Sequence, residues 1–166
     1  MADASKQLGA MTFAYGPRRG KKMNFQNPIA PCDILEVYVT GLGVVTGGLP
    51  ADGTPGIGLN PTPGEAKVVV YDDGTKLVIG QTQIPPRFLE LRKAAGFIQY
   101  SGLTPGFVGL YQINMEWPNP QANPAPFTPP LAEGNYTAFI EFNGRRSQQF
   151  VLPIRNDASI SPCRVR

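Results

Sequence analysis

The amino-acid sequence predicts an all-β protein, an Ig-like β-sandwich of about seven strands with an extended N-terminal arm and long Pro/Gly-rich loops. The 166 residues include 19 glycines and 18 prolines, so long uninterrupted helices are not expected. Hydrophobic residues still make up 42% of the chain, which is enough for a packed core. They fall in short runs between turn signals, and several runs alternate apolar and polar residues, as half-buried strands do. A single domain is the economical prediction for this length.

The first 31 residues differ in character from the rest. They are small and polar at first and then read "MTFAYGPRRGKKMNFQNP", in which aromatic residues mix with four cations. We predict that residues 1–31 are an extension and residues 32–166 the sandwich domain. The extension could pair as an added strand with a neighbouring copy, or it could fold back on its own domain. The residues expected to make this assembly arm are Phe13, Tyr15, Met23 and Phe25.

The first core strand is predicted in "DILEVYVTGLGVV", where apolar residues alternate before Gly41 and Gly43 permit a bend or bulge. A loop without periodicity follows over residues 47–64. The next run, "KVVVYDDGTKLVIG", predicts a hairpin that turns at Asp-Gly. After it, "RFLELRKAAG" is compatible with one or two helical turns or with another strand.

The second half of "LTPGFVGLYQINMEWP" alternates cleanly and predicts a core strand. Tyr111 and Trp117 share the parity expected to face the core, while Gln112 and Asn114 have the other parity. The passage "NPQANPAPFTPPLAEG" then predicts an extended, polyproline-like surface crossover. The final hairpin is predicted in "NYTAFIEFNGRRSQQFVLPI", with an Asn-Gly turn that requires positive φ at both positions.

Cys32 and Cys163 lie near the two ends of the predicted domain. A disulfide between them would close a long loop and contribute on the order of 4–5 kcal/mol in the chain-entropy model. Two unpaired buried thiols are the alternative, and the absence of histidine argues against a shared metal. A disulfide would imply an oxidising setting, so an extracellular or cell-surface location is expected.

Composition excludes several classes of function. A net charge of +3 and a pI near 9.0 are weak for a dedicated nucleic-acid binder. No run of about 18 apolar residues could span a bilayer, so no membrane span is expected. The spacing of Asp72 and Asp73 does not fit a calcium loop, and no nucleotide-binding fingerprint occurs. We therefore expect no cofactor and no metal.

Enzymatic activity is not expected either. Without histidine, Ser-His-Asp catalysis, Cys-His catalysis and His-ligated zinc all fall away. Glu116 and Glu141 have polar parity on two strands that could be neighbours, which is the remaining arrangement for acid-base chemistry. Ordinary surface glutamates alternating with core residues are the simpler interpretation.

Three blocks carry a family resemblance. "VYVTGLG", "GLTPGFVGLYQINMEWP" and "GNYTAFIEFNGRRSQ" resemble, in that order, the signature of an uncharacterised Solibacter-type C-terminal domain family abundant in Acidobacteria, and the chain is also similar to Ig-like IPT/TIG modules. The resemblance covers residues 33–155 and implies an Ig-like module of secreted or surface proteins with no assigned activity. The signature residues are Gly41, Gly43, Pro105, Gly106, Gly109, Tyr111, Gln112, Asn114 and Gly144.

The function expected from the sequence is that of a non-enzymatic extracellular structural or adhesive subunit. It would self-associate, as a filament or surface layer, through its N-terminal extension, so its partners would be copies of itself. The alternative is a glycan-binding accessory module that stacks sugar faces on exposed aromatic side chains. The candidates for that stacking are Tyr15, Tyr38, Tyr71, Tyr100, Tyr136 and Trp117, although the parity of Trp117 predicts burial.

Overall fold

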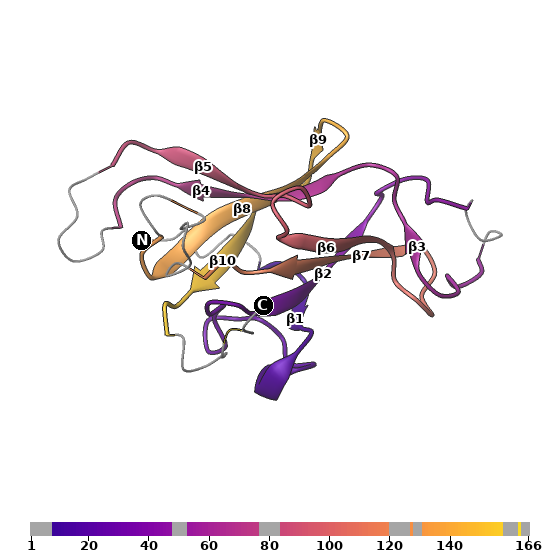
Figure 1. Ribbon diagram of the computed structural model, residues 1–166, viewed down its shortest axis with the longest axis horizontal. Coiled ribbons are helices and arrows are strands. Elements are labelled where there is room, and N and C mark those ends of the chain that lie inside the picture. Colours follow the sequence, from indigo (N-terminus) through magenta and orange to yellow (C-terminus); the bar gives the residue numbers. More distant parts are fainter. Residues whose placement is uncertain are drawn as a thin grey trace.

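The computed structural model describes residues 8–47, 53–76, 84–119, 127, 131–157 and 163. Two antiparallel sheets pack face to face, one above the other in Figure 1. Sheet A has the strand order β10-β8-β4-β5, with β9 beside β8, and sheet B has the order β1-β2-β7-β6-β3. The predicted all-β sandwich is therefore confirmed.

Seven of the described strands have at least five residues, and three are shorter. Sheet A contains β4 (Ala66–Asp72), β5 (Arg87–Leu91), β8 (Gly134–Phe142), β9 (Arg145–Arg146) and β10 (Phe150–Ile154). Sheet B contains β1 (Met11–Phe13), β2 (Ile34–Thr40), β3 (Asn60–Pro61), β6 (Ile98–Leu103) and β7 (Leu110–Glu116). The helical structure is one 3-10 turn, η1 (Gly16–Arg18), in the described part of the chain.

The core lies between the sheets and follows the period-two pattern. In β2 and β7, the side chains of Leu35, Ile113 and Met115 point inward and are fully buried. In sheet A, Val68 and Leu152 meet them from the other side, equally buried. Alternation thus sends one row of each strand into the core and leaves the other row on an outer face.

Residues 8–31 pack against the sandwich of their own chain, which is one of the two arrangements considered for the extension. β1 pairs with β2, so that Phe13 lies opposite Leu35. Leu8 and Ile29 form parallel bridges to β10, at Val151 and Ile154. The arm therefore covers the edges of both sheets on one side, because those edges carry backbone groups that need partners.

A buried ion pair fixes the point where the arm joins β2. The guanidinium of Arg18 pairs with the carboxylate of Asp33 and donates a hydrogen bond to the carbonyl oxygen of Pro28 at 2.7 Å. It also lies 4.1 Å from the centre of the Phe13 ring. Asp33 accepts a second hydrogen bond, from the backbone N–H of Ala30 at 2.6 Å. The sequence pattern showed Arg18 only as one of four cations in the extension and gave no sign of this role.

Cys32 and Cys163 form a disulfide, with their Cα atoms 5.1 Å apart. The predicted disulfide is therefore confirmed, and the alternative of two free thiols is wrong. It joins the end of the arm to a residue 131 positions further along the chain.

Two local expectations need comment. β4 pairs with β8 on one side and with β5 on the other, where Tyr71 lies opposite Phe88. The second strand of the hairpin predicted after Asp73 falls on residues 77–80, outside the described residues. "RFLELRKAAG" begins as the strand β5 and continues as a turn, so the helical alternative is wrong. In β5, Leu89 and Leu91 are buried, and Phe88 packs against Tyr71 of β4 on the outer face. These contacts in the sheet outweigh the helix propensity of the segment.

The final hairpin has the predicted turn. Asn143 has φ 48° and Gly144 has φ 74°, as an Asn-Gly turn between twisted strands requires. β10 then returns along β8, with Leu152 opposite Tyr136. No helix within the described ranges is long and apolar enough to cross a membrane.

Candidate functional site

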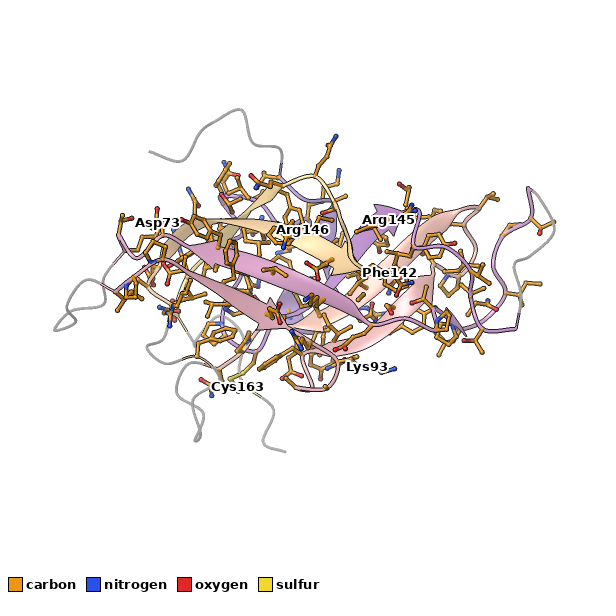
Figure 2. All side chains as sticks on the ribbon, turned by 90° about the horizontal axis from the view of Figure 1, so that it is seen from above. Asp73, Lys93, Phe142, Arg145, Arg146 and Cys163 are labelled. Atoms are coloured by element: carbon orange, nitrogen blue, oxygen red, sulfur yellow. A yellow bond between two sulfur atoms is a disulfide. The ribbon has the colours of Figure 1, made fainter. Side chains whose placement is uncertain are left out.

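The outer face of sheet A carries an aromatic strip formed by Tyr71, Phe88 and Phe139 (Figure 2 looks onto this face). The Phe88 ring centre lies 5.1 Å from that of Tyr71 and 6.4 Å from that of Phe139. Phe88 is 61% exposed, Tyr71 is half-buried and Phe139 is buried. Paired residues on adjacent strands point to the same side of a sheet, and Tyr71 is paired with Phe88. Phe139 is paired with Val69, which has the same parity as Tyr71, so all three rings lie on one face.

A charged row crosses the same face beside the strip and contains Arg92, Glu90, Lys67, Glu141 and Arg146. The ammonium of Lys67 lies 2.9 Å from Glu90 and 2.8 Å from Glu141. The second oxygen of Glu90 pairs with Arg92, and that of Glu141 lies 3.2 Å from Arg146. Arg146 also covers the ring of Phe139 at 4.7 Å, which joins the charged row to the aromatic strip.

The protonation states of the charged row follow from these contacts. The hydrogen bond from Lys67 holds the pKa of Glu141 and that of Glu90 below their usual values. In return, the hydrogen bond to Glu141, followed by that to Glu90, raises the pKa of Lys67. All three groups are ionised at neutral pH, so the face presents fixed donors and acceptors next to an apolar ring.

The outer face of sheet B is polar, and among the residues described there it carries no aromatic strip of this kind. Glu36 accepts hydrogen bonds from Thr12 at 3.1 Å and from the hydroxyl of Tyr38 at 2.9 Å. Next to it, Gln112 donates to Asn114 at 2.6 Å. The polar side chains of this face therefore bond to one another, within β2 and within β7, and from Thr12 of β1 to Glu36 of β2.

Tyr38 and Tyr100 are half-buried on this polar face. Burial raises the pKa of each hydroxyl, so both remain protonated in neutral solution. The Tyr100 hydroxyl donates to the carbonyl oxygen of Leu103 at 2.8 Å, and it lies 2.5 Å from the place where a Cβ on Gly102 would be. Tyr100 thus fills the space above a glycine in its own strand and offers little free surface.

The signature residues lie at turns and in sheet B. Tyr111 donates its hydroxyl to the carbonyl oxygen of Gly43, so the first two signature blocks are in direct contact. Pro105 forms a bridge with Gly56. Gln112 and Asn114 lie on the outer face of sheet B. Positive φ angles occur at the remaining signature positions, Gly41, Gly43, Gly106, Gly109 and Gly144.

The four side chains expected to form an assembly arm divide into two pairs. Phe13 and Met23 are 1% and 3% exposed and belong to the core of their own domain. Tyr15 and Phe25 are exposed. The apolar half of the arm is therefore engaged within the same chain.

The carboxylates Glu116 and Glu141 do not form a pair. β7 belongs to sheet B and β8 to sheet A, and polar parity on each strand points away from the core. The two carboxylates consequently lie on opposite outer faces, and the expectation that their strands could be neighbours is wrong. Glu116 accepts a hydrogen bond from Gln99 at 2.9 Å instead.

Asp72 and Asp73 act within a turn. Asp72 accepts from the backbone N–H of Gly74 and lies 3.1 Å from Arg87. Asp73 accepts from the hydroxyl of Thr75 at 2.7 Å, and this hydrogen bond lowers its pKa. Over the described ranges, no group of three cysteine, aspartate or glutamate side chains could hold a metal ion.

A cleft of about 560 Å³ lies at one end of the sandwich, and we call it the end cleft. It lies between residues 39–43, at and just after the end of β2, and the turn between β8 and β9. Its apolar walls include Leu42, Ile140 and Phe142, and Arg145 and Arg146 stand at its rim. Sequence reasoning missed it because its two sides are about a hundred residues apart; the adjacent arginines after the Asn-Gly turn are the signal that could have drawn attention to it.

The six aromatic side chains considered for stacking on sugars differ in burial and in the face on which they lie. Tyr136 and Trp117 are buried, and the hydroxyl of Tyr136 donates to the carbonyl oxygen of Ala132 at 2.9 Å. Of the others, Tyr71 belongs to the aromatic strip, beside Phe88. Sequence reasoning missed Phe88 because it lies in the segment that was ambiguous between helix and strand.

None of the family models, curated proteins or solved structures compared with this chain matches it.

Proposed function

We propose that this chain is a non-enzymatic extracellular adhesive module that binds surface glycans through the outer face of sheet A. The observation that carries the proposal is the exposed ring of Phe88, which lies beside Tyr71 and next to the charged row. A sugar ring presents an apolar C–H face and a rim of hydroxyl groups. The aromatic strip suits the first, and the ordered carboxylates and cations suit the second.

The exposure of Phe88 needs an explanation because it differs from that of a scattered surface residue. A single exposed apolar side chain is ordinary on a protein surface. Phe88 instead continues a row of aromatic rings across the outer face of sheet A and borders side chains that ion pairs already hold in place. Ligand binding to such a face costs little conformational entropy, because the ion pairs restrain the polar groups beforehand.

The non-enzymatic part of the proposal rests on the residues present. The sequence contains no histidine. Glu90 and Glu141 are occupied by Lys67 and arginines, so neither is poised to exchange a proton near neutral pH. The disulfide supports an oxidising location, in agreement with the setting that the resemblance to the Solibacter-type family implies.

The test is a binding measurement with a matched pair of variants. Phe88→Ala and Phe25→Ala remove the same ring from two exposed sites, one on sheet A and one in the arm. We expect a panel of neutral and acidic polysaccharides, in affinity electrophoresis, to identify at least one that retards the intact chain. Phe88→Ala should weaken that binding at least about tenfold because a stacked ring is lost, while Phe25→Ala should leave it unchanged.

Both variants should melt at the temperature of the unmodified chain, since both rings lie outside the core. Binding that survives Phe88→Ala would contradict the proposal. So would the absence of binding to every polysaccharide of the panel.

Self-association through the arm is the second candidate, and one observation favours it. The arm is held by strand pairing at the edges of both sheets, at β1 on β2 and at Leu8 on β10. A neighbouring copy could supply the same backbone hydrogen bonds by exchanging its arm, because domain swapping repeats the contacts made within one chain. The exchange would leave the Cys32–Cys163 disulfide in place.

Analytical ultracentrifugation at low and high protein concentration tests this second candidate. An exchanging arm predicts dimers or longer chains at high concentration that persist on dilution. A chain that remains monomeric throughout the concentration range would rule out the exchange. Deleting residues 1–31 is a poor test, because it also removes Phe13, Met23 and Ile29 from the core.

A further inference from the structure

We propose that the end cleft binds the carboxylate of an acidic sugar, so that the ligand of this module is a polysaccharide containing uronic acid. The inference rests on the proposed glycan-binding function and extends it from a surface to a class of ligand. Three features of the described residues carry it, and they concern the charge of the cleft, its shape and its position.

The charge of the cleft is one-sided. Arg145 and Arg146 both line it, and among its described lining residues there is no carboxylate. Arg146 is compensated by Glu141. The guanidinium of Arg145 has no ion-pair or hydrogen-bond partner in the described part of the chain, and the side chain is exposed. An anionic group on a ligand would therefore meet an uncompensated cation with a planar donor fork, which suits a carboxylate.

The shape and lining of the cleft suit a sugar ring with a charged substituent. A volume of about 560 Å³ is within the range of small-ligand sites. Leu42, Ile140 and Phe142 give it apolar walls, and Asn143 and Ser147 place polar groups at its edge. In β8 and β9, Arg145 lies opposite Phe142, so the cation and an aromatic side chain border the same space.

The position of the cleft joins it to the aromatic strip. Arg146 stacks on Phe139, and Phe139 lies 6.4 Å from Phe88. Arg146 is also the neighbour of Arg145 in β9. Figure 2 shows Phe142 and Arg145 close together on the side away from Asp73, with Arg146 between them and Asp73. Arg146 lies opposite Glu141 on the outer face, and Arg145 lies opposite Phe142 on the inner side of the same short strand. A glycan chain that stacks on Phe88 could therefore pass Arg146 and turn around the edge of the sheet at β9 to place a carboxylate at Arg145.

The experiment compares acidic polymers with neutralised forms of the same polymers. Polygalacturonate, alginate and hyaluronate are each paired with a methyl-esterified form, and the binding of the intact chain is measured by affinity electrophoresis at low salt. We expect at least one acidic polymer to bind about tenfold or more tightly than its ester, as a charge-assisted hydrogen bond in a partly enclosed site would give. Added salt should reduce the difference.

Two variants with the same change in charge decide whether the end cleft is responsible. Arg145→Gln should abolish the preference for the acidic form and leave binding of the ester unchanged. Arg19→Gln, at an exposed residue of the arm, should keep the preference. An equal loss in both variants would indicate general attraction to a basic protein and would overturn the inference.

The remaining outcomes separate this inference from the proposed function. Equal binding of acid and ester, lost in Phe88→Ala, would overturn the uronate proposal and leave the glycan-binding face intact. If the chain binds neither form of any polymer, the uronate proposal fails, and the wider polysaccharide panel with Phe88→Ala then decides the proposed function independently.

Discussion

The two outer faces of the sandwich are built differently. On sheet B, Glu36, Tyr38, Gln112 and Asn114 bond to one another and present a polar surface. On sheet A, an exposed aromatic ring lies beside five alternating charges. Two signature residues lie on the first of these faces, and none lies on the second.

The difference separates the residues that specify the fold from those that would specify a ligand. The signature supplies turns at its glycines and a contact between two blocks through Tyr111 and Gly43. The face of sheet A uses Phe88 and Lys67, which the signature does not include.

The largest effect on stability is expected from a substitution in the arm, outside both faces. If the arm also governed ligand binding, the comparison between the two faces would fail. Arg18→Met leaves the carboxylate of Asp33 buried without its cation. We expect the free energy of unfolding to fall by about 3–5 kcal/mol, measured by urea denaturation.

Arg19→Met is the matched control for this prediction. Arg19 is exposed, so its replacement should change stability by no more than about 0.5 kcal/mol. Similar values for the two variants would show that the buried pair contributes little.

A smaller loss of stability is expected from Tyr111→Phe. This variant tests whether sheet B contributes to the stability of the fold and not to ligand binding. Gly43 is exposed, so its carbonyl can bond to water instead, and loss of the hydroxyl should cost about 0.5–1.5 kcal/mol in the free energy of unfolding. Glycan affinity should not change. Tyr71→Phe, on sheet A, is the control and should alter stability by less than about 0.5 kcal/mol. A change of affinity in Tyr111→Phe would contradict the division between the two sheets.

The charged row predicts a modest dependence of stability on pH. The pKa values of Glu90 and Glu141 are lowered in the folded protein, so their contribution is present above the unfolded pKa of about 4.3 and is lost as the pH falls through the folded value. Lys67 acts in the opposite sense: its pKa is raised, and its contribution is lost in strong alkali.

Lys67→Met should therefore flatten the acid side of a plot of melting temperature against pH. Lys93→Met, at an exposed residue beyond β5, should keep the original slope. If the unmodified chain and the two variants have the same slope of melting temperature against pH below neutral pH, solvent screens the ion pairs so strongly that they do not contribute to stability.

The smallest effect is expected from Gln112→Leu on the outer face of sheet B. The side chain is half-buried and bonds to Asn114, which can turn to water instead. Stability should shift by no more than about 0.5 kcal/mol, measured by thermal melting, and glycan affinity should stay the same. A tenfold loss of glycan affinity would show that the binding site lies on sheet B and not on sheet A, contrary to the proposal.

The sequence was sufficient for features that are local or periodic. Alternation identified β7 and placed Gln112 and Asn114 outside, and the Asn-Gly pair identified the last turn. It was insufficient where partners are distant in the chain. The charged row and the end cleft each join segments whose proximity depends on sheet order, which no local pattern encodes.

The arm illustrates the same limit. Its apolar residues Phe13 and Met23 are interrupted by glycines and cations, so no period indicated a buried face. Their burial depends on the free edges of β2 and β10, which become evident only when the sheets are assembled. Pairing with those edges within one chain and pairing with a neighbour's edges use the same hydrogen bonds, so sequence alone could not separate them.

The disulfide between Cys32 and Cys163 has a consequence for mechanical load. A pulling force applied to residues outside this pair can pass through the covalent bond between the two sulfur atoms, so the disulfide protects the segment between the cysteines, which are 131 positions apart, from being extended. Within the described chain, only residues 8–31 then lie in the loaded path. Under tension the arm would separate from the sheet edges first, while the aromatic strip and the end cleft would keep their shape.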